Sequence, residues 1–177
     1  IGGAMAHSLQ VGVYPLAVGT NQIFINTRPD FERGVFMPRP KAVIVVGLGE
    51  EGKLRTTDLA HSVRQAVIAW AQRLAEQKRQ AEPAFFELAA TLIGSGGTGV
   101  TAGEAARLIA QGVYDANALL KATHRGDGNW PRVRHLHLIE LYLDRATDAW
   151  RALRLQQAAT PGRYEVGDVV QAGIGPL

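Results

Sequence analysis

Residues 85–113, FFELAATLIGSGGTGVTAGEAARLIAQGV, decide the fold class. The stretch opens with a short apolar run that predicts a strand, and a glycine-rich loop follows at residues 94–99. A helix is predicted over residues 102–122, because Thr101 and Glu104 have the T-x-x-E spacing of a capping box. A strand, a glycine-rich turn and a helix in succession form the repeating unit of α/β proteins.

Further strands and helices alternate on both sides of this unit. Residues 42–46, AVIVV, are a β-branched run of the kind that is buried on both faces of a parallel sheet. Apolar residues at helical spacing predict a helix over residues 57–80. The other predicted elements are strands over residues 9–18, 22–26, 85–93 and 133–143, a helix over residues 147–157 and short β-like pieces in the tail.

The order of these elements predicts a three-layer α/β sandwich, in which helices cover both faces of a mostly parallel sheet. The strands over residues 9–18 and 22–26 would form an antiparallel edge hairpin, since the sequence GTN between them favours a turn. A chain of 177 residues is normally one domain. We place that domain at residues 9–177 and set residues 1–8 apart as a cloning remnant or a disordered lead.

Composition excludes several classes of site. The chain has no cysteine, which rules out disulfides, thiolate zinc sites and a cysteine nucleophile, and fits a cytoplasmic location. No long apolar run or signal peptide is present, so we expect no membrane partner. The net charge of +3 is spread along the chain without a basic cluster interleaved with aromatic residues, so nucleic acid is not an expected partner either.

Two loops that follow predicted strands match the pattern G-x-G-x-x-G. The first is GLGEEG at residues 47–52 and the second is GSGGTG at residues 94–99. Glycines allow the backbone to approach a ligand, and the amides of the next helix can bind a phosphate. The candidate contact residues are Gly47, Gly49, Gly94, Ser95, Gly96, Gly97, Thr98, Gly99 and Thr101. The alternative is that the glycines only permit tight turns, which we favour for the first loop and weigh equally for the second.

A dinucleotide cofactor is not expected at either loop. A Rossmann site has an acidic residue about 20 positions after the first glycine, at the end of the next strand. That position is Val67 for the first loop and near Asp115 for the second, and both lie inside predicted helices. Glu50 and Glu51 would also repel a pyrophosphate. We therefore predict no cofactor.

Three segments resemble known families. AVIVVGLGEEGKLRTTDL resembles the amino-terminal domain of leucyl aminopeptidases, and LIGSGGTGVTAGEAARLIAQGV and VRHLHLIELYLDRATDAWRAL resemble macrodomains. The closest resemblance is to an uncharacterised region of large bacterial proteins that carry a caspase-like CHAT protease domain. Its matching residues are Tyr14, Pro15, 45–49, 94–101 and 140–146. The resemblance implies a macro-like fold and an ADP-ribose or nucleotide pocket, although the N-x-A-N motif of catalytic macrodomains is absent.

Other chemical candidates are weaker. His135 and His137 share one face of a predicted strand, but no third ligand has a companion spacing, so we predict no metal site. No serine lies in a G-x-S-x-G elbow, and we assign no catalytic residue. Glu140, if buried, requires a partner, for which Arg145 is the candidate.

The first functional hypothesis is a non-catalytic module of a larger bacterial protein that senses or binds a phosphate-bearing molecule, such as a nucleotide. One alternative is a protein–protein interaction domain whose glycine loops are structural and which docks on other domains of its parent protein. The other alternative is a hydrolase of ADP-ribose derivatives. We leave open whether the chain is an enzyme, and we favour the interpretation that it is not.

Overall fold

The computed structural model describes residues 3–14, 16–27, 40–50, 52–77, 85–96, 99–123 and 130–173. Within these ranges the chain forms α1 (Ala4–Gln10), β1 (Asn21–Ile25), β2 (Ala42–Val46), α2 (Thr56–Gln77), β3 (Phe85–Thr91), α3 (Ala102–Ala122), β4 (Arg132–Ile139) and α4 (Leu143–Ala159). The predicted α/β class is confirmed. Part of the lead segment at residues 1–8 is helical, and its Ser8 is buried.

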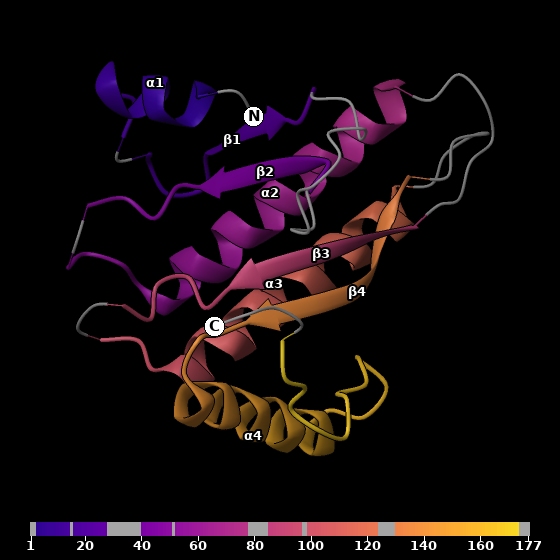
Figure 1. Ribbon diagram of the computed structural model, residues 1–177. Helices are drawn as coiled ribbons and strands as arrows, with labels where there is room; N and C mark the ends of the chain where they lie inside the picture. Colours follow the sequence, from indigo (N-terminus) through magenta and orange to yellow (C-terminus); the bar gives the residue numbers. More distant parts are fainter. Residues whose placement is uncertain are drawn as a thin grey trace.

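The strands form two pairs (Figure 1). β1 and β2 are antiparallel, with Asn21 opposite Val46, whereas β3 and β4 are parallel, with Thr91 opposite Ile139. Among the described residues, β2 does not pair with β3. The predicted edge hairpin between residues 9–18 and 22–26 is therefore wrong, because β1 pairs with β2, which we expected inside a parallel sheet.

The described residues of the segment 9–18 do not form the predicted strand. α1 extends to Gln10, and Gly12 and Gly19 adopt φ angles of 73° and 78°, which interrupt an extended chain. The segment instead reaches β1 through side chains, because the Tyr14 hydroxyl donates to Gln22 Oε1 at 2.8 Å. Within its described residues the tail also lacks the predicted β pieces.

The three long helices pack side by side, with α3 between α2 and α4, and Figure 1 shows α2 and α3 behind the strands. Two glycines of α3 let its neighbours approach closely. A Cβ atom on Gly112 would lie 2.6 Å from the Ala60 carbonyl oxygen of α2, and one on Gly103 would lie 2.9 Å from Ala152 Cβ of α4. Most of the buried core lies between these helices and the strands.

The β3–β4 pair has one covered face among the described residues. Leu88 and Leu136 are partly buried and pack on the helical core, whereas Glu87, His135 and His137 are more exposed on the other face. The structure is thus a mixed α/β arrangement with helices on one side of this pair. The second helical layer of a three-layer, macro-like sandwich stays a prediction.

Candidate functional site

The first glycine-rich loop lies directly against residues 16–20. The Gly47 amide donates to the Thr20 carbonyl at 2.8 Å, and the Gly49 amide donates to the Leu16 carbonyl at 2.9 Å. A Cβ atom on Gly47 would lie only 2.0 Å from the Ala17 carbonyl oxygen. These two amides already have protein acceptors, so they are not available to a phosphate.

Ser62 of α2 holds this contact together. Its buried hydroxyl donates to the Gly47 carbonyl at 2.6 Å and accepts a hydrogen bond from the Gly19 amide at 2.9 Å. One hydroxyl therefore joins α2 to the first loop and to the preceding turn. This geometry gives Gly47 a structural role, which is the interpretation that the sequence favoured for this loop.

The second loop is more open. Gly94 has a φ angle of 82° and packs on Leu54, whose Cδ2 would be 3.0 Å from an added Cβ. Gly96 is exposed, and within the part of the chain that the structure describes an added Cβ there would meet no atom within 4 Å. Gly99 is exposed as well, with a φ angle of 119°, whereas Gly97 and Thr98 lie outside the described residues.

The first turn of α3, which follows this loop, is capped by the protein itself. Thr101 Oγ1 accepts the Glu104 amide at 3.1 Å, which confirms the predicted Thr101 cap. Asp148 of α4 accepts the Gly103 amide at 2.8 Å through Oδ2. A carboxylate thus takes one of the amides that would bind an anion at this helix end. The sequence carried no signal for Asp148, because it reaches α3 only through helix packing.

A charged network ties the second loop to the start of α4. Glu140 and Arg145 form the predicted ion pair, with 2.9 Å between Oε2 and Nε. Arg145 Nη2 also donates to Ser95 Oγ at 2.7 Å, and the buried Ser95 hydroxyl donates to the Leu92 carbonyl. We call these three side chains the Glu140–Arg145–Ser95 network. It makes Ser95 an anchor of the loop, with its hydroxyl already engaged.

Glu140 also orders the backbone that leaves β4. Its Oε1 accepts the Leu141 amide at 2.7 Å and the Tyr142 amide at 3.3 Å. The hydrogen bond from Arg145 is the main reason that the pKa of Glu140 lies below its ordinary value of 4.5, and it outweighs the opposing effect of burial. The carboxylate is therefore ionised at neutral pH and holds this turn in place.

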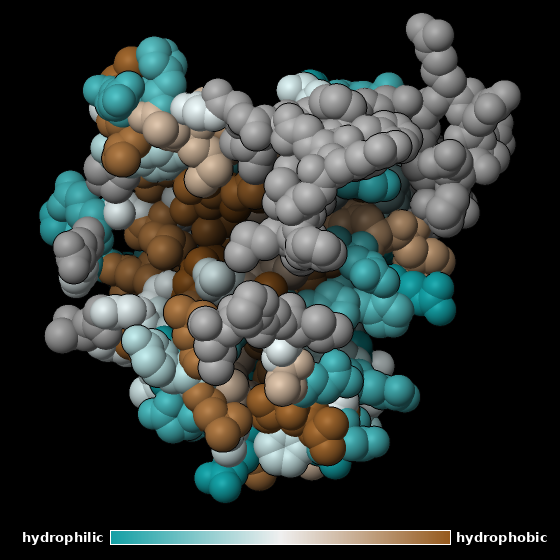
Figure 2. Space-filling model, in the orientation of Figure 1, coloured by the Kyte–Doolittle hydropathy of each residue, from teal (hydrophilic) through white to brown (hydrophobic). Residues whose placement is uncertain are grey.

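A group of exposed apolar side chains surrounds this turn, and Figure 2 shows hydrophobic residues on the surface beside the start of α4. Ile139, Leu141, Tyr142 and Leu143 are 54%, 87%, 64% and 72% exposed, and we call them the 139–143 patch. The sequence analysis placed these residues in a strand of the sheet, where apolar character indicates burial. In the structure β4 ends at Ile139, so the following residues point away from the core. Sequence reasoning therefore missed this surface.

The open face of the β3–β4 pair carries a second polar group. Glu87 lies 3.2 Å from His135 Nδ1 and 3.8 Å from His137 Nε2, measured from its two carboxylate oxygens. The two histidines share a face, as predicted, but they are exposed. Across the ranges that the structure describes, no set of three histidine, aspartate or glutamate side chains has the arrangement of a metal site.

Comparisons with models of protein families, with curated proteins and with solved structures found no match. The resemblance to macrodomains, to leucyl aminopeptidases and to CHAT-associated regions therefore stays a prediction. Among the described helices, none combines the length and the apolar character that crossing a bilayer requires.

Proposed function

We propose that this chain is a protein–protein interaction module that docks on another domain or another chain through the 139–143 patch. The observation that supports this function is the exposure of four large apolar side chains within five residues, from 54% to 87%. Single exposed apolar residues are normal on a protein surface, but a contiguous group is typical of an interaction site.

The patch is also held in a fixed conformation, which favours binding. Glu140 accepts the amides of Leu141 and Tyr142, and the Tyr142 carbonyl accepts the Ala146 amide at 2.9 Å as α4 begins. An ordered backbone lowers the entropy that is lost when a partner binds. The side chains are thus presented by a rigid turn.

The glycine-rich loops support this assignment indirectly. The amides of Gly47, Gly49 and Gly103 have protein acceptors, and Ser95 is engaged by Arg145. Polar groups that are already engaged within the protein, together with an exposed apolar surface, favour an interaction domain.

Photo-cross-linking tests the proposal. A photoreactive amino acid replaces Leu141 in the full-length protein in its native cells, and the matched control carries it at Leu155, an exposed leucine of α4 outside the patch. We expect one discrete adduct from position 141 and none from position 155. Adding Leu143→Lys should abolish the adduct, because a charge would then be buried in the interface.

Absence of a discrete adduct at position 141, or equal adducts at both positions, would reject the patch as an interface. Unfolding by urea provides the folding control. Because Leu143 is exposed, Leu143→Lys should change the free energy of unfolding by less than about 0.5 kcal/mol.

Phosphate binding at the second loop, on a macro-like fold, is the other candidate function. Gly96 is exposed and faces open space, which favours close approach of a ligand. A ligand that binds the folded state raises the melting temperature. ADP-ribose, ATP, cyclic nucleotides, NAD and inorganic phosphate form the test panel. A rise for one of them that Gly96→Glu removes would favour this function, and no rise across the panel would reject it.

A further inference from the structure

The residues after α4 fold back along that helix. We call residues 161–168 the C-terminal arm. Trp150 Nε1 donates to the Gly167 carbonyl at 2.8 Å, and Arg154 Nη1 donates to the Val166 carbonyl at 3.3 Å. Gln157 Oε1 accepts the Val166 amide at 3.1 Å. Hydrogen bonds from three side chains of α4 thus hold the arm alongside this helix.

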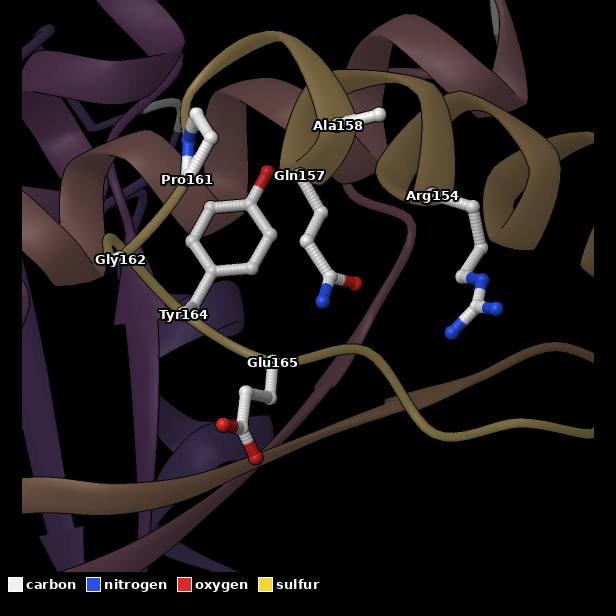
Figure 3. A pocket seen from close by; sticks show the side chains of 7 residues that line it. All are labelled: Arg154, Gln157, Ala158, Pro161, Gly162, Tyr164 and Glu165. Atoms are coloured by element: carbon white, nitrogen blue, oxygen red, sulfur yellow. The ribbon is translucent and has the colours of Figure 1, made fainter.

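A recess of about 490 Å³ lies between α4 and the arm (Figure 3). It is an open surface recess, in which a ligand would stay partly exposed to solvent. Ala158, Pro161 and Gly162 form a small apolar part of its wall, and the Tyr164 ring lies in the middle of the group. Burial raises the pKa of the Tyr164 hydroxyl, so the ring is neutral.

The polar groups of the recess combine both charges. Arg154 Nη1 donates to the Val166 carbonyl and pairs with the exposed Asp168 carboxylate at 3.3 Å, which leaves Nε and Nη2 as further donors. Gln157 uses only Oε1, which leaves its amide nitrogen as a further donor. Glu165 is exposed, and its carboxylate forms no ion pair within the described residues. A guanidinium and an amide thus lie along α4, and a carboxylate lies on the arm (Figure 3).

We propose that this recess binds a small zwitterion of the class of free amino acids and short peptides. The ligand carboxylate pairs with Arg154 and the amide nitrogen of Gln157. The ligand ammonium pairs with the exposed Glu165 carboxylate on the arm. A short aliphatic side chain fits against Ala158 and Pro161. This site is independent of the 139–143 patch.

Titrations followed by the amide NMR signals of the ¹⁵N-labelled chain test the site. The zwitterions alanine and alanyl-alanine are compared with N-acetylalanine, which carries only the negative charge, and alaninamide, which carries only the positive one. We expect a saturable shift of signals from the C-terminal arm with a zwitterion, and about tenfold weaker binding of each singly charged analogue.

Three variants locate the contacts. Glu165→Gln should weaken zwitterion binding about tenfold and leave the weak binding of N-acetylalanine unchanged. Tyr164→Phe should leave binding unchanged, because the buried Tyr164 hydroxyl is assigned no contact with the ligand. Asp144→Asn, which removes an exposed carboxylate of α4 outside the recess, is the matched control.

Two results would overturn the proposal. One is the absence of any saturable shift at the arm with ligand concentrations of about 10 mM. The other is binding of a singly charged analogue as tight as that of the zwitterions.

Discussion

The two glycine-rich loops have the same spacing and different surroundings. In the first loop, Gly47 and Gly49 donate their amides to residues 16–20, and the buried Ser62 hydroxyl completes the contact. In the second loop, Gly96 faces open space, and the Glu140–Arg145–Ser95 network forms the anchor. One loop is fixed by neutral hydrogen bonds inside the protein, and the other by a charged network close to the surface.

This difference shows what the G-x-G-x-x-G pattern encodes. Glycine permits close approach and unusual φ angles, but the pattern does not specify which group approaches. At Gly47 that group is the protein's own carbonyl, from Ala17. At Gly96 no atom of the described residues fills the space. The neighbours of a glycine loop, and not its spacing, therefore decide whether it can bind a ligand.

The largest loss of stability is expected for Gly47→Ala. The new Cβ would lie 2.0 Å from the Ala17 carbonyl oxygen, which is backbone and cannot rotate away. The loop and residues 16–20 must separate, so we expect a loss of at least about 3 kcal/mol in the free energy of unfolding. Urea denaturation measures it. A loss below about 1 kcal/mol would show that the first loop is as loosely packed as the second.

Ser62→Ala should cause the next largest loss of stability. The change leaves the Gly47 carbonyl and the Gly19 amide without their partner in a buried position. We expect a loss of about 2 kcal/mol. Thr123→Ala is the control, since its exposed hydroxyl donates only to the Leu119 carbonyl at the end of α3. If both variants lost the same amount, Ser62 would not be a specific anchor of the first loop.

The sequence predicted the features that depend on neighbouring residues. The bounds of α3, the Thr101 cap and the Glu140–Arg145 pair were all predicted and are confirmed. Each depends on side chains at most five positions apart along a helix or turn, where spacing determines proximity. Local patterns of this kind are present in any single sequence.

The features that the sequence did not reveal depend on distant residues. Ser62 meets Gly19 across 43 positions and Asp148 meets Gly103 across 45. Nothing in either local pattern specifies the partner, because the contact is created by helix packing. The 139–143 patch was missed for another reason. Apolar residues after a strand predict burial, but Glu140 binds the next two amides and ends the strand.

The third residue of each loop is a glycine, and substitution by alanine should lower stability at one of these positions and leave it nearly unchanged at the other. Gly49 has a φ angle of 74°, which an alanine adopts only with strain, so Gly49→Ala should lose about 1.5 kcal/mol. Gly96 has no such φ angle and no close neighbour. Gly96→Ala should therefore change stability by less than about 0.5 kcal/mol in denaturation experiments. Equal losses at the two positions would remove the contrast between the loops.

The smallest loss of stability is expected for Glu140→Gln, in the network that anchors the second loop, and this loss should depend on pH. The pKa of Glu140 is lowered in the folded state, so its contribution to stability is complete above its ordinary value of 4.5 and is lost as the pH falls through the folded value. At pH 7, Glu140→Gln should lose about 1 kcal/mol, because the ion pair is only partly buried. In acid the stabilities of the variant and the wild type should converge, since the protonated carboxyl resembles the amide. Ser62→Ala, which involves no charge, should show a loss that is independent of pH in the same urea titrations. A Glu140→Gln difference that persisted unchanged at low pH would mean that the second loop, like the first, is held by neutral contacts.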